Sequence, residues 1–390
     1  MTDLESQSGR APLRVVIAGG GVAAIEALIA LHTLGQDRLA VVVVSERDEF
    51  IYRPLLVGEP FGLGAPRRYG LEELCTSLDA HFVQDRVVAV RPDDHEVQTA
   101  DGETLAYDVL LMAVGAVTHP AYEFGTSFER EHSPEEFDEV LRDLDEGFVP
   151  TVAIVVPDGI SWPLPAYELA MLTVSWAEQH LGGRVRVTLV TPEPAPLSLF
   201  GPPASDAVRE LLREEGVEVR CNAVADVVSS TALRVDGTWM DAERIVSLPR
   251  VTGPRIPGLP CDTHGFLEVD AFGRVAGVDD VYAAGDGTNI AVKQGGLAAQ
   301  QADVAATHIA VRAGAEVQPH PLEPVLRGLL VARDGPCFLR AELHDVEGTS
   351  AFSREALWWP PSKIASRWLA PHLAYLESER PYERGADVDV

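Results

Sequence analysis

Two stretches near the N-terminus are hydrophobic at nearly every position. Residues 14–18 (RVVIA) and 39–45 (LAVVVVS) are short apolar runs, and residues 22–34 between them place Ala and Leu at the spacing of a buried helix. Continuous rather than alternating apolar runs are typical of parallel strands covered on both faces. The order therefore predicts a strand–helix–strand unit.

The same order of elements recurs in the middle of the chain. Residues 152–156 (VAIVV) and 185–190 (VRVTLV) are expected to be strands, with a helix over 165–180 between them. An acidic residue follows the second strand of each unit, Glu46 in the first and Glu193 in the second. This repeat predicts an α/β protein with two Rossmann-like domains built on parallel sheets.

The remaining segments are patterned differently. Residues 97–109 predict a hairpin that turns at Asp101-Gly102, and residues 266–314 predict strands followed by a long Ala-rich helix. From about residue 322 onward we expect a short strand region and then an aromatic helix broken by proline. These segments predict a small C-terminal region beyond the two larger units.

A glycine-rich turn joins the first predicted strand to its helix. Residues 19–24 (GGGVAA) fit the dinucleotide pattern G-x-G-x-x-A. Gly19 permits the tight turn, Gly21 lets a pyrophosphate approach the backbone, and Ala24 lets the helix pack close to the strand. The amide N–H groups at the helix N-terminus suit the phosphates. Glu46, 22 residues after Ala24, stands where a carboxylate can bind ribose hydroxyls.

Two later segments suit the same nucleotide. Residues 107–115 (YDVLLMAVG) predict a strand that ends in a turn of small residues. Residues 280–286 (DVYAAGD) bring Asp286 into a turn where its carboxylate can accept a hydrogen bond from a hydroxyl group. Gly295 and Gly296 then open a helix, whose N-terminus stabilises negative charge on a nearby ring system.

These three motifs, in this order over residues 14–315, resemble the flavoproteins with two dinucleotide-binding domains of the pyridine nucleotide–disulfide oxidoreductase superfamily. Residues 50–56 (FIYRPLL) resemble a segment beside the flavin in the type II NADH dehydrogenase and sulfide:quinone oxidoreductase branch. The resemblance implies FAD as cofactor. The FAD-binding residues that it implies are Gly19, Gly21, Val22, Ala23, Ala24, Glu46, Arg47, Arg53, Pro54, Val87, Ala113, Gly115, Gly285, Asp286, Gly295 and Gly296.

The resemblance also implies a domain organisation. The FAD-binding domain is expected to be discontinuous, at residues 1–120 and 263–322. A second, NAD(P)-like dinucleotide-fold domain is expected at residues 121–262. Residues 323–390 would form a C-terminal region with an aromatic-basic helix.

The cysteines do not match the thiol chemistry of that superfamily. Cys75, Cys221, Cys261 and Cys337 lie far apart, without the CxxC or CxxxxC spacing of disulfide reductases. In the sulfide-oxidising members that the chain resembles, a catalytic cysteine stands where this chain has Trp162. No metal-ligand spacing is present either. A redox-active dithiol and a persulfide mechanism are therefore disfavoured.

The second glycine loop departs from a nucleotide cradle. Residues 157–168 (PDGISWPLPAYE) keep one glycine, carry Asp158, and are four residues longer than the first loop up to the equivalent helix position, Glu168. A carboxylate with bulky Trp and Pro residues makes a poor site for pyrophosphate. The sequence therefore disfavours ordinary NAD(P)H binding there.

Two residues are candidates for catalysis. The resemblance places Glu168 beside the flavin, where a buried carboxylate can move a proton. The alternative is a buried glutamate satisfied by backbone groups or arginine. Lys293, just before the Gly295 helix, can polarise the flavin or an acceptor carbonyl. The alternative for it is a solvated surface lysine.

Charge limits the partners. With 31 basic and 60 acidic residues the net charge is −29, which repels phosphate and argues against nucleic acid. We find no signal peptide and no transmembrane helix, so a cytoplasmic location is predicted. The aromatic and basic residues of 355–376 suit either peripheral contact with the inner membrane face or packing within the protein or a homodimer.

Together these observations predict an FAD-dependent oxidoreductase that passes electrons from a small-molecule donor through flavin to a quinone or similar acceptor, without a dithiol. One alternative is an NAD(P)H dehydrogenase with an atypical second loop. Another is a non-catalytic protein in which FAD is structural.

Overall fold

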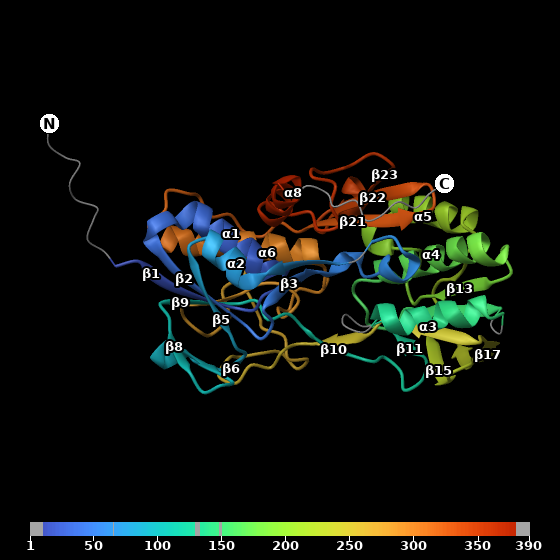
Figure 1. Ribbon diagram of the computed structural model, residues 1–390, viewed down its shortest axis with the longest axis horizontal. Coiled ribbons are helices and arrows are strands. Elements are labelled where there is room, and N and C mark those ends of the chain that lie inside the picture. The colour runs from blue at the N-terminus through green and yellow to red at the C-terminus, as the bar shows by residue number, and fades with distance from the viewer. Residues whose placement is uncertain (1–10, 65, 129–132, 148–149, 380–390) are drawn as a thin grey trace.

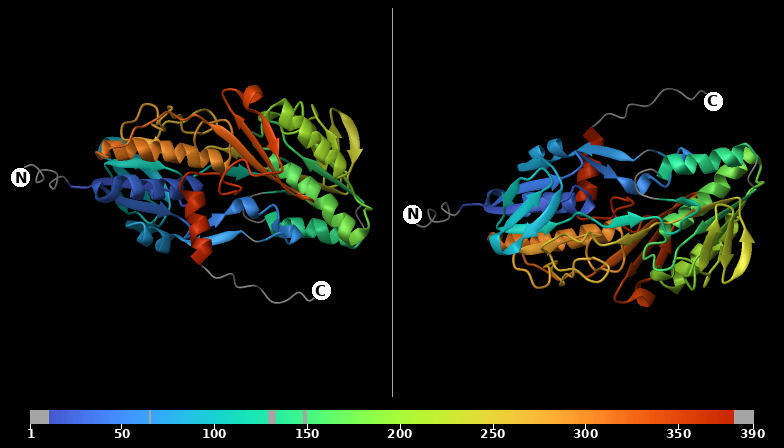
Figure 2. Two further views of the ribbon diagram at one scale, coloured as in Figure 1. Left: turned by 90° about the horizontal axis from the view of Figure 1, so that it is seen from above. Right: turned by 90° about the horizontal axis from the view of Figure 1, so that it is seen from below.

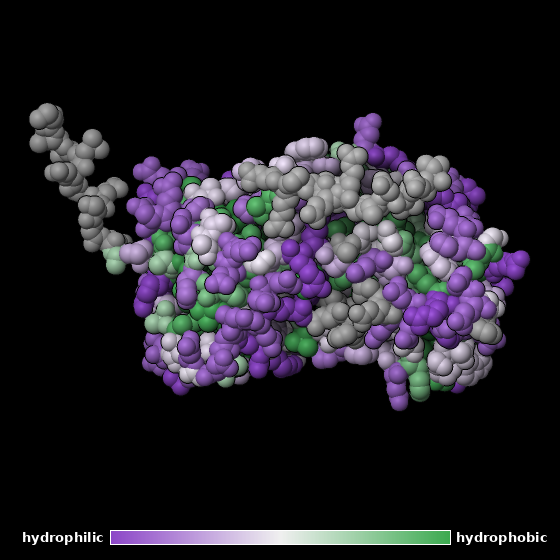
Figure 3. Space-filling view, in the orientation of Figure 1, coloured by the Kyte–Doolittle hydropathy of each residue, from purple (hydrophilic) through white to green (hydrophobic). Residues whose placement is uncertain are grey.

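The computed structural model describes residues 11–64, 66–128, 133–147 and 150–379. The molecule is elongated, with the N-terminal elements and α6 at one end and the elements of the middle of the chain at the other (Figure 1). The C-terminal strands lie along one side of both ends. On the face drawn in Figure 3 hydrophilic residues predominate and hydrophobic residues form separate patches.

The first sheet is parallel and has the strand order β20-β9-β1-β2-β5. Its inner strand β1 is buried along four consecutive residues, as the continuous apolar run predicted. Helices α1 and α6 pack together on one face, where Ile25, Leu28 and Ile309 are fully buried. The bounds of these elements are β1 Leu13–Ala18, α1 Val22–Gly35, β2 Leu39–Ser45, β5 Ala80–Gln84, β9 Val109–Met112, β20 Val281–Ala283 and α6 Gly295–Arg312.

Smaller elements cover the rest of this first unit. The antiparallel sheet β6-β7-β8 shares a core with the opposite face of the parallel sheet, and the predicted hairpin turn at Asp101-Gly102 joins β7 to β8. The bounds are β3 Glu49–Tyr52, β4 Arg67–Gly70, α2 Leu71–Ser77, β6 Val87–Arg91, β7 Glu96–Thr99 and β8 Thr104–Ala106.

The second sheet repeats this plan in the order β11-β18-β12-β13-β14, all parallel. Helix α4 is buried over most of its length, and α3 and α5 pack beside it in the same core. The bounds are β11 Thr126–Ser127, α3 Ser133–Asp145, β12 Thr151–Val155, α4 Leu164–Leu181, β13 Arg186–Val190, α5 Pro202–Glu214, β14 Glu218–Arg220 and β18 Arg244–Ser247. The predicted α/β class with two parallel Rossmann-like sheets is confirmed.

The chain passes twice between the two units. Strands β10 (Val117–His119) and β19 (Arg250–Thr252) pair antiparallel and lie between the ends of the molecule (Figure 1). The second unit also carries the antiparallel sheet of β15 (Ala225–Ser229), β16 (Ala232–Val235) and β17 (Thr238–Asp241). Because β20 and α6 return to the first unit, we propose the discontinuous boundaries given above, which remain a prediction.

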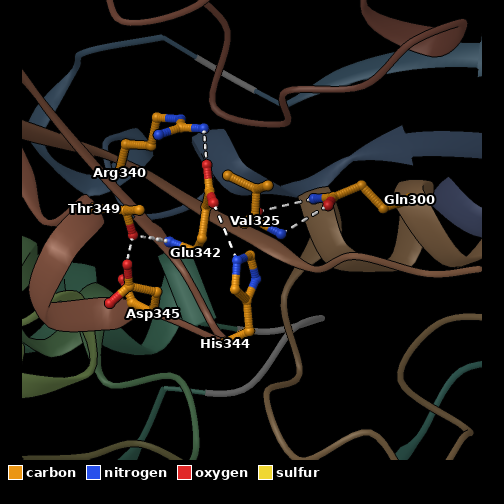
Figure 4. A network of polar contacts seen from close by, with 7 residues as sticks. All are labelled: Gln300, Val325, Arg340, Glu342, His344, Asp345 and Thr349. Carbon is orange, nitrogen blue, oxygen red and sulfur yellow. Dashed lines mark hydrogen bonds and ion pairs between the residues drawn. The ribbon is translucent and has the colours of Figure 1, made fainter.

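The C-terminal sheet is fastened to both units. Strands β21 (Val325–Ala332), β22 (Gly335–Glu342) and β23 (Ala351–Ser353) are antiparallel, with the short helix α7 (Val346–Thr349) between the last two. The sheet contributes Leu326 and Leu330 to the core of the second unit. The amide of Gln300 on α6 forms two 2.9 Å hydrogen bonds with the backbone of Val325, as Figure 4 shows.

Beyond this sheet the aromatic and basic residues are not helical. Helix α8 spans Leu369–Glu379 and therefore begins after Trp358, Lys363 and Trp368, contrary to the expected aromatic-basic helix. The physical reason is the pair Pro360-Pro361, because neither residue has an N–H to donate within a helix. Instead Trp358 packs edge-on against Phe338.

Part of this segment faces inward and part faces solvent. The indole of Trp368 donates a 2.6 Å hydrogen bond to Asp303 on α6, whereas Trp359 is 86% exposed. Figure 2 shows α8, in red, set across the blue helix α1. Packing within the protein therefore accounts for much of the segment, while membrane contact and a homodimer remain predictions. Among the described residues, no helix is both long and apolar enough to cross a bilayer.

Candidate functional site

A single cavity of about 700 Å³ brings together the first glycine loop, the start of α4, the start of α6 and the C-terminal segment. This volume is within the range of small-molecule and cofactor sites. The cavity lies at the carboxyl ends of parallel strands, which is where open α/β sheets bind ligands.

The glycine loop after β1 leaves open space for a ligand. Gly19 has a φ of +124°, and a Cβ at this position would lie 2.2 Å from the carbonyl oxygen of Ala113. At Gly21, by contrast, an added Cβ would meet nothing within 4 Å. Helix α1 begins directly after Gly21 without a side-chain cap. An uncapped helix N-terminus facing open space is the arrangement that a pyrophosphate requires, so these residues fit FAD.

Most of the site residues that the resemblance implies are part of the lining of this one cavity. Two of the predicted set are not. Ala24 is fully buried, and Gly296 is covered by the side chain of Gln294 and the carbonyl of Ala365. Both lie behind the residues that line the cavity. The predicted residues that line the cavity are Gly19, Gly21, Val22, Ala23, Glu46, Arg47, Arg53, Pro54, Val87, Ala113, Gly115, Glu168, Gly285, Asp286, Lys293 and Gly295.

The end of the cavity beyond β2 is suited to a ribose. The Glu46 side chain is 73% exposed, and its Oε1 lies 3.8 Å from the Arg86 guanidinium. Asp85 and Arg86 also line the cavity and were missed from the sequence. A signal for them existed: they follow β5, which pairs in parallel with β2, so the two strand ends meet at one edge of the sheet.

The opposite end is shaped by the turn before α6. Gly285 has a φ of +87°, and its N–H donates a 3.1 Å hydrogen bond to Gln301. The Gln294 side chain caps α6 by accepting a 2.8 Å hydrogen bond from the N–H of Leu297. Asp286 and Gly295 line the cavity next to this cap. The helix N-terminus is thus held beside the cavity, as the motif predicted.

Lys293 is not a solvated surface lysine. Its Nζ donates hydrogen bonds to the carbonyl oxygens of Thr288, at 2.5 Å, and Ile290, at 2.7 Å. The ammonium also lies 3.9 Å from the centre of the Phe266 ring. Burial lowers the pKa of Lys293 to about 8. These contacts hold the turn before α6, and a role in catalysis remains a prediction.

Glu168 has a partner that the sequence did not reveal. The Nζ of Lys363 lies 2.5 Å from Oε1 of Glu168, which also accepts a 2.9 Å hydrogen bond from the N–H of Val331. The side chains are 1% exposed for Glu168 and 11% for Lys363. Burial raises the pKa of Glu168, and the Lys363 ammonium opposes that rise. Lys363 lies 195 positions from Glu168, so no spacing rule connects the two residues.

Apolar side chains also line the cavity. They come from both units and from the C-terminal region, and they line the same cavity as the ion pair, together with polar residues such as Ser161 and Lys293. The residues are Val57, Phe128, Ile160, Trp162, Leu164, Leu248, Leu329 and Ile364. None of the four cysteines, all within the described residues, lines the cavity. Burial raises the pKa of Cys75 to about 11.

The loop before α4 offers few donors to a second nucleotide. Pro163 and Pro165 have no N–H, and the N–H of Ala166 donates to the Pro163 carbonyl at 2.9 Å. Glu193, the counterpart of Glu46, accepts hydrogen bonds from Tyr167 at 2.6 Å and Thr191 at 2.9 Å. Burial raises the pKa of the Glu193 carboxyl. The groups that would hold a dinucleotide are missing here or are bonded within the protein.

Comparison with known proteins agrees with this geometry. The family model described as pyridine nucleotide-disulphide oxidoreductase matches residues 164–314. This match runs from α4 of the second unit through α6 and is a similarity to that family over part of the chain. A sulfide-quinone reductase of Aquifex aeolicus is 28% identical over 228 residues, which are 55% of this chain and 50% of that protein. The match thus spans half of that relative's length. An NADH dehydrogenase-like protein of Mycobacterium tuberculosis is 28% identical over 293 residues, 70% of this chain and 72% of that protein.

A solved structure shows the likeness in fold. The sulfide:quinone oxidoreductase of Aquifex aeolicus superposes with a TM-score of 0.77 at 20% identity, covering 87% of this chain and 86% of that one. These similarities agree with the sequence-based resemblance to the pyridine nucleotide-disulphide oxidoreductases, and FAD as cofactor and the oxidoreductase activity are taken up as a proposal below. The donor and the acceptor are not identified by these comparisons.

Proposed function

We propose that the protein is an FAD-dependent oxidoreductase that passes electrons from a small reductant to a quinone or a similar planar carbonyl acceptor. The observation that carries the proposal is the buried Lys363–Glu168 pair, which lines the same cavity as the dinucleotide cradle. Buried ionisable groups in a cavity are typical of functional sites.

The first unit would hold the cofactor. The α1 N-terminus at Gly21 suits the pyrophosphate, Glu46 suits the ribose, and Asp286 with the start of α6 suits the ring end. When bound, FAD supplies two-electron chemistry at its isoalloxazine ring. The apolar side chains that line the cavity would limit the access of water to that ring.

The ion pair suits the acceptor. A quinone needs two electrons and two protons to become a hydroquinone. Lys363 Nζ would donate a hydrogen bond to one carbonyl oxygen and stabilise the negative charge that gathers there during reduction. The Lys363 ammonium would give one proton to the reduced acceptor, and solvent would restore that proton and supply the second. Glu168, as the carboxylate partner, would hold the ammonium in place. The apolar side chains would enclose the ring of the acceptor.

The donor is the less defined partner. The Aquifex relative is named for sulfide and quinone, but no cysteine of this chain lines the cavity, which argues against a persulfide route. The Mycobacterium relative is named for NADH, and its match over most of both chains favours the alternative of an NAD(P)H dehydrogenase. Pro163, Pro165 and the bonded Glu193 weigh against that alternative.

The test is an anaerobic titration of the FAD-loaded protein. Flavin absorbance is followed while NADH, NADPH and sulfide are added in turn, and a short-chain quinone is then added to protein reduced by dithionite. We expect quinone to reoxidise the wild-type flavin rapidly. In Lys363→Met the same step should slow roughly 10- to 100-fold, as for removal of a charge-stabilising donor.

The matched control is Arg354→Met, which removes an exposed positive charge in the same C-terminal region. It should leave the rate of reoxidation unchanged. Equal rates for Lys363→Met and the wild type would contradict the proposed role of the pair. A wild-type flavin that no quinone reoxidises would instead favour a structural FAD.

A further inference from the structure

A second buried carboxylate also binds the C-terminal segment. Glu26 lies on α1, is fully buried, and accepts three backbone hydrogen bonds. Its Oε1 accepts from the N–H groups of Arg367 at 3.1 Å and Trp368 at 3.0 Å, and its Oε2 accepts from that of Leu369 at 2.6 Å. A buried carboxylate persists in a fold only where hydrogen bonds compensate for its lost hydration.

These donors are the N–H of Leu369, the first residue of α8, and those of the two residues before it. The next helical amide, that of Ala370, donates a 2.8 Å hydrogen bond to the Ser366 hydroxyl. The first N–H groups of a helix have no partner within the helix, and a side chain at the N-cap normally binds them. Here the cap comes from Glu26, more than 340 positions earlier in the chain. Its negative charge also meets the positive end of the α8 dipole. Asp303 on α6 binds the indole of Trp368 and lies 3.5 Å from the Arg367 guanidinium.

The same stretch of chain carries Lys363. We name residues 363–369 the strap. At its first residue Lys363 meets Glu168, and at the next residue the N–H of Ile364 donates a 2.9 Å hydrogen bond to the hydroxyl of Tyr52. The Ile364 side chain packs on Gly295, where an added Cβ would lie 3.1 Å from it. The strap therefore forms one wall of the cavity over the start of α6.

The two carboxylates that hold the strap occupy matching places. Glu26 is the fifth residue of α1 and Glu168 is the fifth residue of α4, and the two helices directly follow β1 and β12, the middle strands of their sheets. The strap thus runs from one repeat to the other, bound near each end by the same position of the repeat.

We propose that Glu26 is a positioning residue for the acceptor site: by capping α8 it fixes the strap and so sets Lys363 against Glu168. The importance of Lys363 rests on the function proposed above. Glu26 does not line the cavity, so it acts on the acceptor only through the strap.

The variants are Glu26→Gln, which keeps the shape and one acceptor oxygen, and Glu26→Ala, which removes the three bonds that Glu26 accepts and leaves the bond from the Ala370 N–H to Ser366. The control is Val97→Ala, which opens a cavity in the separate core under β6 and β7. Hydrogen exchange of strap amides is measured in the FAD-loaded proteins. We expect these amides to exchange roughly 10-fold faster in Glu26→Gln and faster still in Glu26→Ala. In Val97→Ala their exchange should change only as far as the loss of global stability requires.

A double-mutant cycle then separates positioning from general destabilisation. Glu26→Gln alone should lower kcat/KM for the short-chain quinone roughly 5- to 10-fold, chiefly by raising KM. In a Lys363→Met background the same change should have no further effect, because the group that it positions is absent. Additive effects of the two changes would overturn the proposal.

Failure of the proposed function is distinguishable. If the wild-type protein does not reduce quinone at all, the acceptor role of Lys363 fails, whereas the exchange data still decide the cap. Unchanged protection of the strap in Glu26→Gln would then overturn the positioning role of Glu26. Faster exchange confined to the strap would support it.

Discussion

The two glycine loops of this protein sit on the same strand–helix frame and differ in what their backbone offers. Before α1, Gly21 opens onto empty space and the first helical amides face a cavity. Before α4, Pro163 and Pro165 remove donors, and Trp162 packs edge-on against Phe200. The repeat therefore preserves the frame, while a few residues at its turn determine whether it binds an anion.

The helices behind those loops show the opposite relation. Their fifth residues, Glu26 and Glu168, are both glutamate and both buried, although the loops before them differ in length. Each binds a part of the C-terminal region rather than a nucleotide. The two repeats thus share the buried glutamate of the helix while differing in the loop before it.

The largest expected effect comes from Gly21→Asp. Gly21 has a φ of −92° and open space around its Cβ position, so a side chain adds no strain, but a carboxylate would face the pyrophosphate. Like charges brought together cost several kcal/mol, so FAD affinity should fall by more than about 100-fold. The measurement is flavin content after purification, followed by FAD titration of the apoprotein.

The matched change in the other loop is Gly159→Asn, because Gly159 has a φ of +81° that asparagine tolerates. It should leave FAD affinity unchanged. Equal loss of flavin from both variants, or an unfolded Gly21→Asp apoprotein, would remove the contrast between the loops.

A smaller effect concerns the pH dependence of stability that Glu26 causes. Burial raises the pKa of Glu26 from 4.5 to about 7. The folded carboxyl therefore keeps its proton between pH 4.5 and 7 while the unfolded one releases it, so this group's stabilising effect is lost as pH rises through 7. The loss amounts to about 3 kcal/mol.

Denaturant unfolding of wild type and Glu26→Gln, at pH 5 and pH 8 with excess FAD, isolates this group, because the other titrations are common to both proteins. The free energy of unfolding of the wild type, relative to that of Glu26→Gln, should be larger at pH 5 than at pH 8 by about 3 kcal/mol. Parallel stability curves for the two proteins would show that Glu26 does not titrate in this range.

The smallest expected effect concerns NADH. Because the second loop offers few donors and Glu193 is already bonded to Tyr167, we expect NADH to leave the bound flavin oxidised over minutes under anaerobic conditions. Asp158→Asn, which removes the only charge of that loop's turn, should behave in the same way. Saturable bleaching at low NADH concentration would show that the loop opens, and would favour the dehydrogenase alternative.

Patterns of residues close together in the chain predicted most of the strands and helices of the two parallel-sheet units. Apolar runs predicted β1, β2, β12 and β13 to within one residue at each end, and the glycine turn predicted where α1 begins. These features depend on residues close together in the chain. Gly295 was placed correctly beside the cavity for the same reason, since a strand, a turn and a helix follow one another there.

The sequence could not predict what depends on distant residues. Lys363 was interpreted as part of an aromatic-basic helix, and nothing in its neighbourhood indicated that its ammonium reaches Glu168. The role of Glu26 as the cap of α8 was missed for the same reason. Only the scarcity of lysine, with two in the chain, set Lys363 apart.

The strap also has a consequence for the order of biosynthesis. The wall that carries Lys363 is translated long after the glycine cradle, because Gly21 and Lys363 are 342 positions apart in the chain. During translation the nascent chain would therefore expose Glu26 without the backbone N–H groups that it binds in the folded protein. The apolar side chains near Glu168 would also be exposed until the strap emerges from the ribosome. Chaperones that shield hydrophobic surface would be needed most in that interval, and a stalled chain would be recognisable by an open cavity at a fully formed nucleotide fold.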